Sequence, residues 1–194
     1  MKTDVMTVSS KKDQIGAALE QAEKVAQYKD LSHKSALHLR LLTEEVMSMM
    51  RSIAGDVAGD FWMETEGNVF SLHLKVNTGM DEAQRKQWLG ASTSGKNEAT
   101  RGIMGKLRAF FEPTEGLPVV YGTDMLDVTM YSDMVWSMRE YQEKVQESLK
   151  MQQGDAQEAW DELEKSVIFH IADDVKVSIK GHTVEMVITK TMTA

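Results

Sequence analysis

The apolar positions between Leu37 and Ile53 predict a long helix with one buried face. Glu45 falls at the border of this buried face, where a carboxylate is less solvated and its pKa can shift. It could serve as a catalytic acid or base, or it could be an ordinary boundary residue whose carboxylate reaches solvent. The stripe repeats every three or four residues, the period of a helix packed on one side, and consists of Leu39, Leu42, Val46, Met49, Met50 and Ile53.

Two strands are predicted directly after this helix, from Phe61 to Glu66 and from Val69 to Val76, with a tight turn at Gly67-Asn68 between them. In the second strand apolar residues alternate with polar ones, so one face is expected to be buried and the other wetter. His73 lies on the wetter face. It is interpreted as a solvated surface side chain rather than a metal ligand, because no second His stands at ligand spacing.

Similar patterns predict the remaining elements, and Ser32 is expected to cap the central helix. These elements are a strand over Met6-Thr7-Val8, helices over 11–28, 81–89, 99–111, 128–151 and 155–171, and a closing hairpin with strands over 175–179 and 183–188. The predicted fold is α/β: a two-layer sandwich with a mixed, mainly antiparallel sheet and helices on one face. We expect one domain over residues 1–194, with a helical insertion at 113–153.

Composition and charge argue against several classes of function. The chain has 194 residues, of which 42% are hydrophobic, enough to bury a core without disulfides, and it contains no Cys. A net charge of −8 argues against general nucleic-acid binding, which needs clustered Lys and Arg. No apolar run approaches the roughly 20 residues of a membrane helix. These features predict a cytoplasmic protein with no membrane partner.

A polar loop from Gly90 to Asn97 is the one candidate for phosphate binding. Ser94, Gly95 and Lys96 lie where a helix is predicted to begin, and unpaired N–H groups at such a position attract anions. The loop lacks the first Gly and the spacing of a true phosphate loop. A plain helix cap and a phosphate cradle therefore both remain open.

The order of helix, hairpin and Asn77-Thr78-Gly79 resembles the histidine kinase-like ATPase superfamily, and within it the anti-sigma-factor serine kinases. In that superfamily, which includes gyrase, heat-shock chaperones, histidine kinases and mismatch-repair proteins, a helix carries Glu-x-x-x-Asn. The Glu activates water or a substrate hydroxyl, and the Asn holds Mg²⁺. A hairpin then leads to Asp-x-Gly, whose Asp reads adenine. Here Glu45 matches the Glu, Met49 replaces the Asn, and Asn77 replaces the Asp.

The C-terminal run from Ala172 to Met186 resembles the end of an anti-sigma kinase domain, where Asp-Glu-Val leads into Thr-Val-x-Met. Only Gly154 remains where the family has a Gly-x-Gly phosphate loop. The resemblance places Glu45 in the catalytic position. It assigns nucleotide binding to Met49, Asn77, Gly79, Ser94, Gly95, Lys96, Gly102, Gly105 and Thr183.

These residues imply a degenerate ATP-binding domain that acts as a regulator. The expected ligand is ATP or ADP, and the expected partner is another protein or a second copy of the chain in a homodimer. A thioether does not replace an amide oxygen as a Mg²⁺ ligand, so Met49 makes Mg²⁺ binding doubtful and efficient ATPase or serine kinase activity unexpected. The alternative is a protein-interaction module on the same fold, in which Met fills the pocket.

Overall fold

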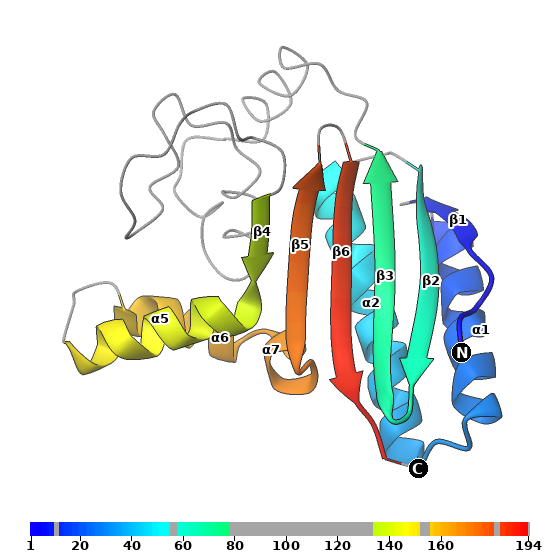
Figure 1. Cartoon of the computed structure of the whole chain (residues 1–194), viewed down its shortest axis with the longest axis horizontal. Helices are drawn as coiled ribbons and strands as arrows, with labels where there is room; N and C mark the ends of the chain where they lie inside the picture. Colours follow the sequence, from blue (N-terminus) through cyan, green and yellow to red (C-terminus); the bar gives the residue numbers. More distant parts are fainter. Residues whose placement is uncertain (10–11, 55–57, 78–133, 152–155, 181–182, 194) are drawn as a thin grey trace.

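The computed structural model describes residues 1–9, 12–54, 58–77, 134–151, 156–180 and 183–193. Its six strands are β1 (Met6–Ser9), β2 (Ala58–Glu66), β3 (Val69–Asn77), β4 (Met134–Ser137), β5 (Asp174–Lys180) and β6 (Thr183–Thr191). They form one sheet in the order β1-β2-β3-β6-β5-β4, and all five pairings are antiparallel (Figure 1). The α/β class is confirmed, but no parallel pair of a mixed sheet is present among the described strands.

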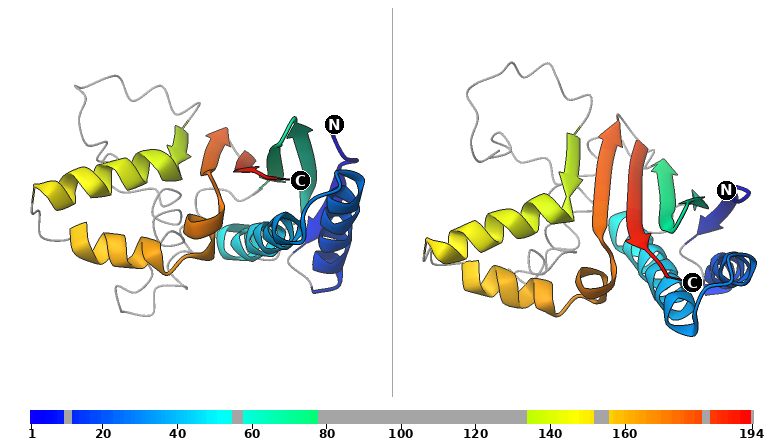
Figure 2. Two further views of the ribbon diagram at one scale, coloured as in Figure 1. Left: turned by 90° about the horizontal axis from the view of Figure 1, so that it is seen from below. Right: turned by 60° about the horizontal axis from the view of Figure 1, so that its bottom comes forward.

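The helices are α1 (Lys12–Tyr28), α2 (His33–Ala54), α5 (Met138–Lys150), α6 (Ala156–Glu164) and α7 (Val167–Ile171). Helices α1 and α2 lie against one face of the sheet, while α5 and α6 extend away from it beyond β4 (Figures 1 and 2). The Ser35 N–H donates to Ser32 Oγ at 3.3 Å, so the predicted cap of α2 is confirmed.

Both predicted hairpins are confirmed. The β2–β3 hairpin turns at Gly67, whose φ of +56° is a conformation that glycine adopts without steric cost. In β3 the side chains of Phe70, Leu72, Leu74 and Val76 alternate with more exposed ones, as the pattern predicts. The second hairpin pairs β5 with β6, and its turn at 181–182 lies outside the described residues.

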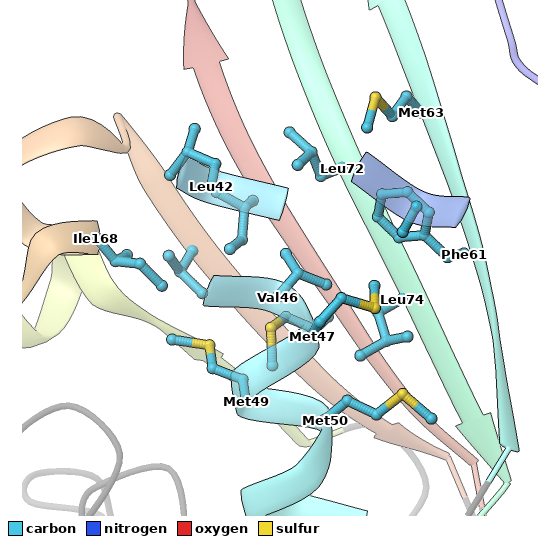
Figure 3. Packing of buried hydrophobic residues seen from close by; sticks show 14 of the residues in the cluster. Leu42, Val46, Met47, Met49, Met50, Phe61, Met63, Leu72, Leu74 and Ile168 are labelled. Carbon is cyan, nitrogen blue, oxygen red and sulfur yellow. The ribbon is translucent and has the colours of Figure 1, made fainter. Parts of the chain in front are cut away.

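The core fills the space between α2 and the inner face of the sheet. Figure 3 shows its centre, where α2 side chains meet residues of β2, β3 and α7. The predicted apolar stripe of α2 is buried up to Met50, beyond which the side chains of the helix are not described. Residues labelled in this core are Leu42, Val46, Met47, Met49, Met50, Phe61, Met63, Leu72, Leu74 and Ile168.

The helix predicted over 128–151 is wrong in its first part. Residues Met134–Ser137 form strand β4, which pairs with β5, and the helix begins only at Met138. Ser137 separates the two, because its backbone is extended and its side chain accepts a hydrogen bond from Glu140 N. The first residues of the predicted helix, 128–133, lie outside the described part.

The single helix predicted over 155–171 is also wrong. Helix α6 ends at Glu164, Ser166 is extended, and α7 starts at Val167. Leu163 and Ile168 are both buried although five residues apart, a spacing that would put them about 140° apart on one continuous helix. The break lets both reach the core, and it leaves Val167 42% exposed.

Candidate functional site

Glu45 lies on α2 and is half-buried, as expected for the border of the core. It forms no hydrogen bond or ion pair with any residue that the structure describes, whereas its neighbour Glu44 pairs with Arg40 at 3.3 Å. Burial raises the pKa of Glu45, and the negative charge of Glu44 raises it further. The catalytic role that the family resemblance implies for Glu45 stays a prediction.

Met49 lies one helical turn beyond Glu45 and is only 2% exposed. It belongs to the buried hydrophobic cluster, part of which Figure 3 shows. A soft sulfur in an apolar core cannot hold a hard cation such as Mg²⁺. On α2, the position that would carry the Mg²⁺-binding Asn in the superfamily is thus part of the core.

Asn77 and Thr183 are brought together by the central pairing of the sheet. Asn77 is the last residue of β3, Thr183 is the first of β6, and the two face each other in the ladder although 106 positions apart in the chain. Asn77 is exposed and Thr183 is half-buried. Helix α2 ends at the same end of the sheet, since β2 starts four residues later beside the end of β3 (Figure 1).

The other residues of the predicted nucleotide site are in segments for which no structure is given. They are Gly79, Ser94, Gly95, Lys96, Gly102 and Gly105, all within residues 78–133. Their part in phosphate binding therefore stays a prediction.

Two surface hollows lie away from Glu45, Asn77 and Thr183. A hollow of 310 Å³ lies between α1 and α2, where Ala26, Ala36 and Leu37 form its apolar floor and the Arg40–Glu23 ion pair of 2.8 Å forms one side. A second, of 490 Å³, lies beside the turn of the β2–β3 hairpin. Neither includes a predicted site residue.

His73 is not the solvated side chain that its strand position predicts. Its side chain is 15% exposed and stacks on Trp62, with the ring centroids 4.7 Å apart and the planes 9° apart. The sequence did contain the signal. A two-residue turn pairs residues equally distant from it, and Trp62 lies five before Gly67 as His73 lies five after Asn68.

Asp173 and Asp174 have separate structural roles, as expected of sequence neighbours. Asp174 is 8% exposed, and its Oδ1 accepts hydrogen bonds from Ser137 Oγ (3.1 Å), Arg139 N (3.2 Å) and Val175 N (2.9 Å). Burial opposes ionisation of Asp173. Hydrogen bonds from Lys190 and from the backbone N–H of residue 191 outweigh it and lower the pKa of Asp173.

A scan against protein-family models gives no match to this chain, and a search of curated proteins gives none either. Among the described helices, none has both the length and the apolar content needed to cross a bilayer.

Proposed function

We propose that the chain is a degenerate histidine kinase-like ATP-binding domain that acts as a regulatory protein, as the anti-sigma kinases do. The observation that carries this proposal is the pairing of Asn77 with Thr183 at the end of the sheet where α2 also ends. Two residues assigned to one nucleotide site from separate motifs are neighbours in space.

The chemistry of this pair suits a purine base. The carboxamide of Asn77 both donates and accepts hydrogen bonds, and the hydroxyl of Thr183 does the same. Asn77 is exposed, so its carboxamide can be reached by a ligand. ATP or ADP is the proposed ligand, with Gly79 and the loop around Ser94-Gly95-Lys96 contributing to phosphate binding.

Binding is proposed without efficient turnover. Glu45 has the raised pKa of a group that could exchange protons with water or a hydroxyl. Met49 offers no oxygen for Mg²⁺, so the charge stabilisation that a metal gives to phosphoryl transfer is reduced. We expect hydrolysis slower than about 1 per second. Turnover above that rate that is abolished in Glu45→Gln would overturn this part.

A protein-interaction module on the same fold is the second candidate, and the burial of Met49 favours it. In that case the old pocket is filled by Met, and the domain acts only through a protein partner or a second copy of itself.

Nucleotide titration separates the two candidates. Fluorescent ATP and ADP analogues are titrated, with and without Mg²⁺, into the parent chain, Asn77→Ala, Thr183→Ala and Thr191→Ala. The last variant is a matched control, because Thr191 lies at the other end of β6 and is exposed. We expect binding to the parent and the control, and a loss of about tenfold in each site variant, the value of one lost hydrogen bond of about 1.4 kcal/mol.

Absence of binding to the parent would overturn the nucleotide proposal and favour the interaction module. Equal binding by the parent, Asn77→Ala and Thr183→Ala would show that the nucleotide lies elsewhere on the protein.

A further inference from the structure

Helices α1 and α2 lie against one face of the sheet (Figure 1). The opposite face carries a cluster of charged and aromatic side chains centred on His73. Across this face Trp62 of β2, His73 of β3 and Val187 of β6 lie side by side in register. Among the residues that the structure describes, no helix covers this face.

His73 lies between two carboxylates on opposite sides of its ring. Nε2 is 3.8 Å from Glu64 Oε2, and Nδ1 is 3.7 Å from Glu185 Oε1. Both ring nitrogens are buried, and neither has a hydrogen-bond partner among the described residues. The two nitrogens point to different strands, so one metal ion could not use both.

The charged imidazole fits this geometry better than the neutral one. Neutral imidazole has one donor and one acceptor, and a ring nitrogen that accepts cannot bond a carboxylate. Protonated imidazole has two donors, and each faces a carboxylate. Closing 3.7 and 3.8 Å to the roughly 2.8 Å of a charge-assisted bond takes a movement of about 1 Å by each Glu side chain.

Burial of the ring favours the neutral form of His73 instead. It lowers the pKa of His73 below its ordinary 6.5, while Glu64 and Glu185 raise it by less and Lys2 lowers it further. His73 is therefore neutral at pH 7 and gains its proton on acidification. The charged or polar groups facing the ring, or next along this face, are Lys2, Asp60, Glu64, Ser71, Lys75, Lys176 and Glu185.

Glu64 faces His73 with Oε2 and already holds two partners with its other oxygen. Its Oε1 accepts from Lys2 Nζ and from Trp62 Nε1, both at 2.9 Å, and Lys2 Nζ also lies 4.9 Å from the centre of the Trp62 ring. Protonation of His73 would place a second cation against the same indole and the same carboxylate, which weakens the hold of Lys2.

We propose that His73 is a proton-operated switch on the open face of the sheet, which on acidification bridges Glu64 of β2 and Glu185 of β6 and weakens the ion pair of Lys2 with Glu64. The switch does not depend on nucleotide binding. Its effect is to make the cluster less negative and to join three strands of this face through one side chain.

The first test is a pH titration of the His ring resonances by NMR, with His73 assigned from His73→Gln. We expect a midpoint below 6.5, the ordinary value of a histidine. Glu64→Gln and Glu185→Gln should each lower the His73 midpoint by about one pH unit, because each removes an anion within 4 Å of the ring. Lys2→Ala should raise it. Glu66→Gln, an exposed carboxylate on the same strand, is the matched control and should leave it unchanged.

The second test uses Trp62 as a reporter, since an imidazolium stacked on an indole quenches its fluorescence. We expect the Trp fluorescence of the parent to fall as the pH drops through the His73 midpoint. This fall should be absent in His73→Gln and in Trp62→Phe. Circular dichroism at each pH checks that the fold is kept.

Three results would overturn the switch. The first is a His73 midpoint unchanged in both Glu64→Gln and Glu185→Gln. The second is a fluorescence step that persists in His73→Gln. The third is unfolding of the parent before His73 titrates, because the switch operates only in the folded chain.

Discussion

Met49→Asn is the substitution that best distinguishes a filled core from a nucleotide cavity. Met49 is 2% exposed, so replacing it removes a buried apolar side chain worth about 1.5–3 kcal/mol. The new amide enters an apolar core and leaves donors and acceptors unpaired, at a further cost of about 1–3 kcal/mol. The free energy of unfolding should therefore fall by about 2.5–6 kcal/mol, a large part of the 5–15 kcal/mol typical of a domain.

Urea denaturation measures this difference, with Met49→Leu as the matched control. Leu keeps the volume and the apolar character, so its cost should stay below about 1.5 kcal/mol. Each variant is measured with and without Mg-ATP. In a filled core, Mg-ATP should not restore the stability lost in Met49→Asn.

A loss below about 1 kcal/mol in Met49→Asn would refute this reasoning. It would mean that the amide reaches water and that residue 49 lines a cavity. A further gain in stability with Mg-ATP, absent in Met49→Leu, would show that the Asn had restored a Mg²⁺ ligand.

Three further predictions concern carboxylates. Asp174→Ala should lower the free energy of unfolding by about 2–3 kcal/mol and Ser137→Ala by about 1 kcal/mol, because Asp174 accepts a hydrogen bond from the Ser137 hydroxyl in a buried site. The double variant should lose less than the sum of the two single losses, and full additivity in urea denaturation would show that the two residues are not coupled. Glu45 has a raised pKa, so its ionisation costs the folded state stability as pH rises above the ordinary 4.5. The stability of Glu45→Gln relative to the parent should therefore increase between pH 4 and pH 7. A difference in stability that does not change with pH would contradict this. Asp173 has a lowered pKa, so its contribution is present above the ordinary 3.8 and is lost as pH falls through the folded value. Asp173→Asn should be less stable than the parent at pH 7, and the difference should close as acid protonates the Asp173 carboxylate of the parent. A difference that persists in acid would refute the assignment.

The parts of the fold that the sequence predicted well depend on local patterns. Helix α2 follows from a 3.6-residue repeat, and the β2–β3 hairpin from alternation around Gly67-Asn68. Each is decided by residues within about 20 positions of one another.

The elements that the sequence predicted wrongly depend on contacts with residues far away in the chain. Strand β4 has four residues and follows helical spacing, so only its pairing with β5 reveals it as a strand. The break at Ser166 is equally hidden, because it serves the burial of Leu163 and Ile168 in one core. Local preference is a weak guide where tertiary contacts decide.

In the candidate site too, features set by local pattern could be predicted from the sequence, and features set by distant contacts could not. The border position of Glu45 and the inward position of Met49 follow from helical period alone. The adjacency of Asn77 and Thr183 does not, because it needs the pairing of strands 106 positions apart, and only the family resemblance joined them beforehand. The burial of His73 does not follow from strand alternation, which gives only the face of a residue. It follows from the hairpin register, which sets the large Trp62 ring opposite His73.

The pairing of β3 with β6 has a consequence for folding during synthesis. The inner edge of β3 gains its partner only after the ribosome has added the 106 positions that separate Asn77 from Thr183. At about 5–20 residues per second, that interval is roughly 5 to 20 s. Through it the nascent hairpin presents unpaired backbone groups and an apolar face, the features that favour aggregation. We expect fragments that end before β6 to need chaperone protection, while the chain through β6 closes this edge by itself.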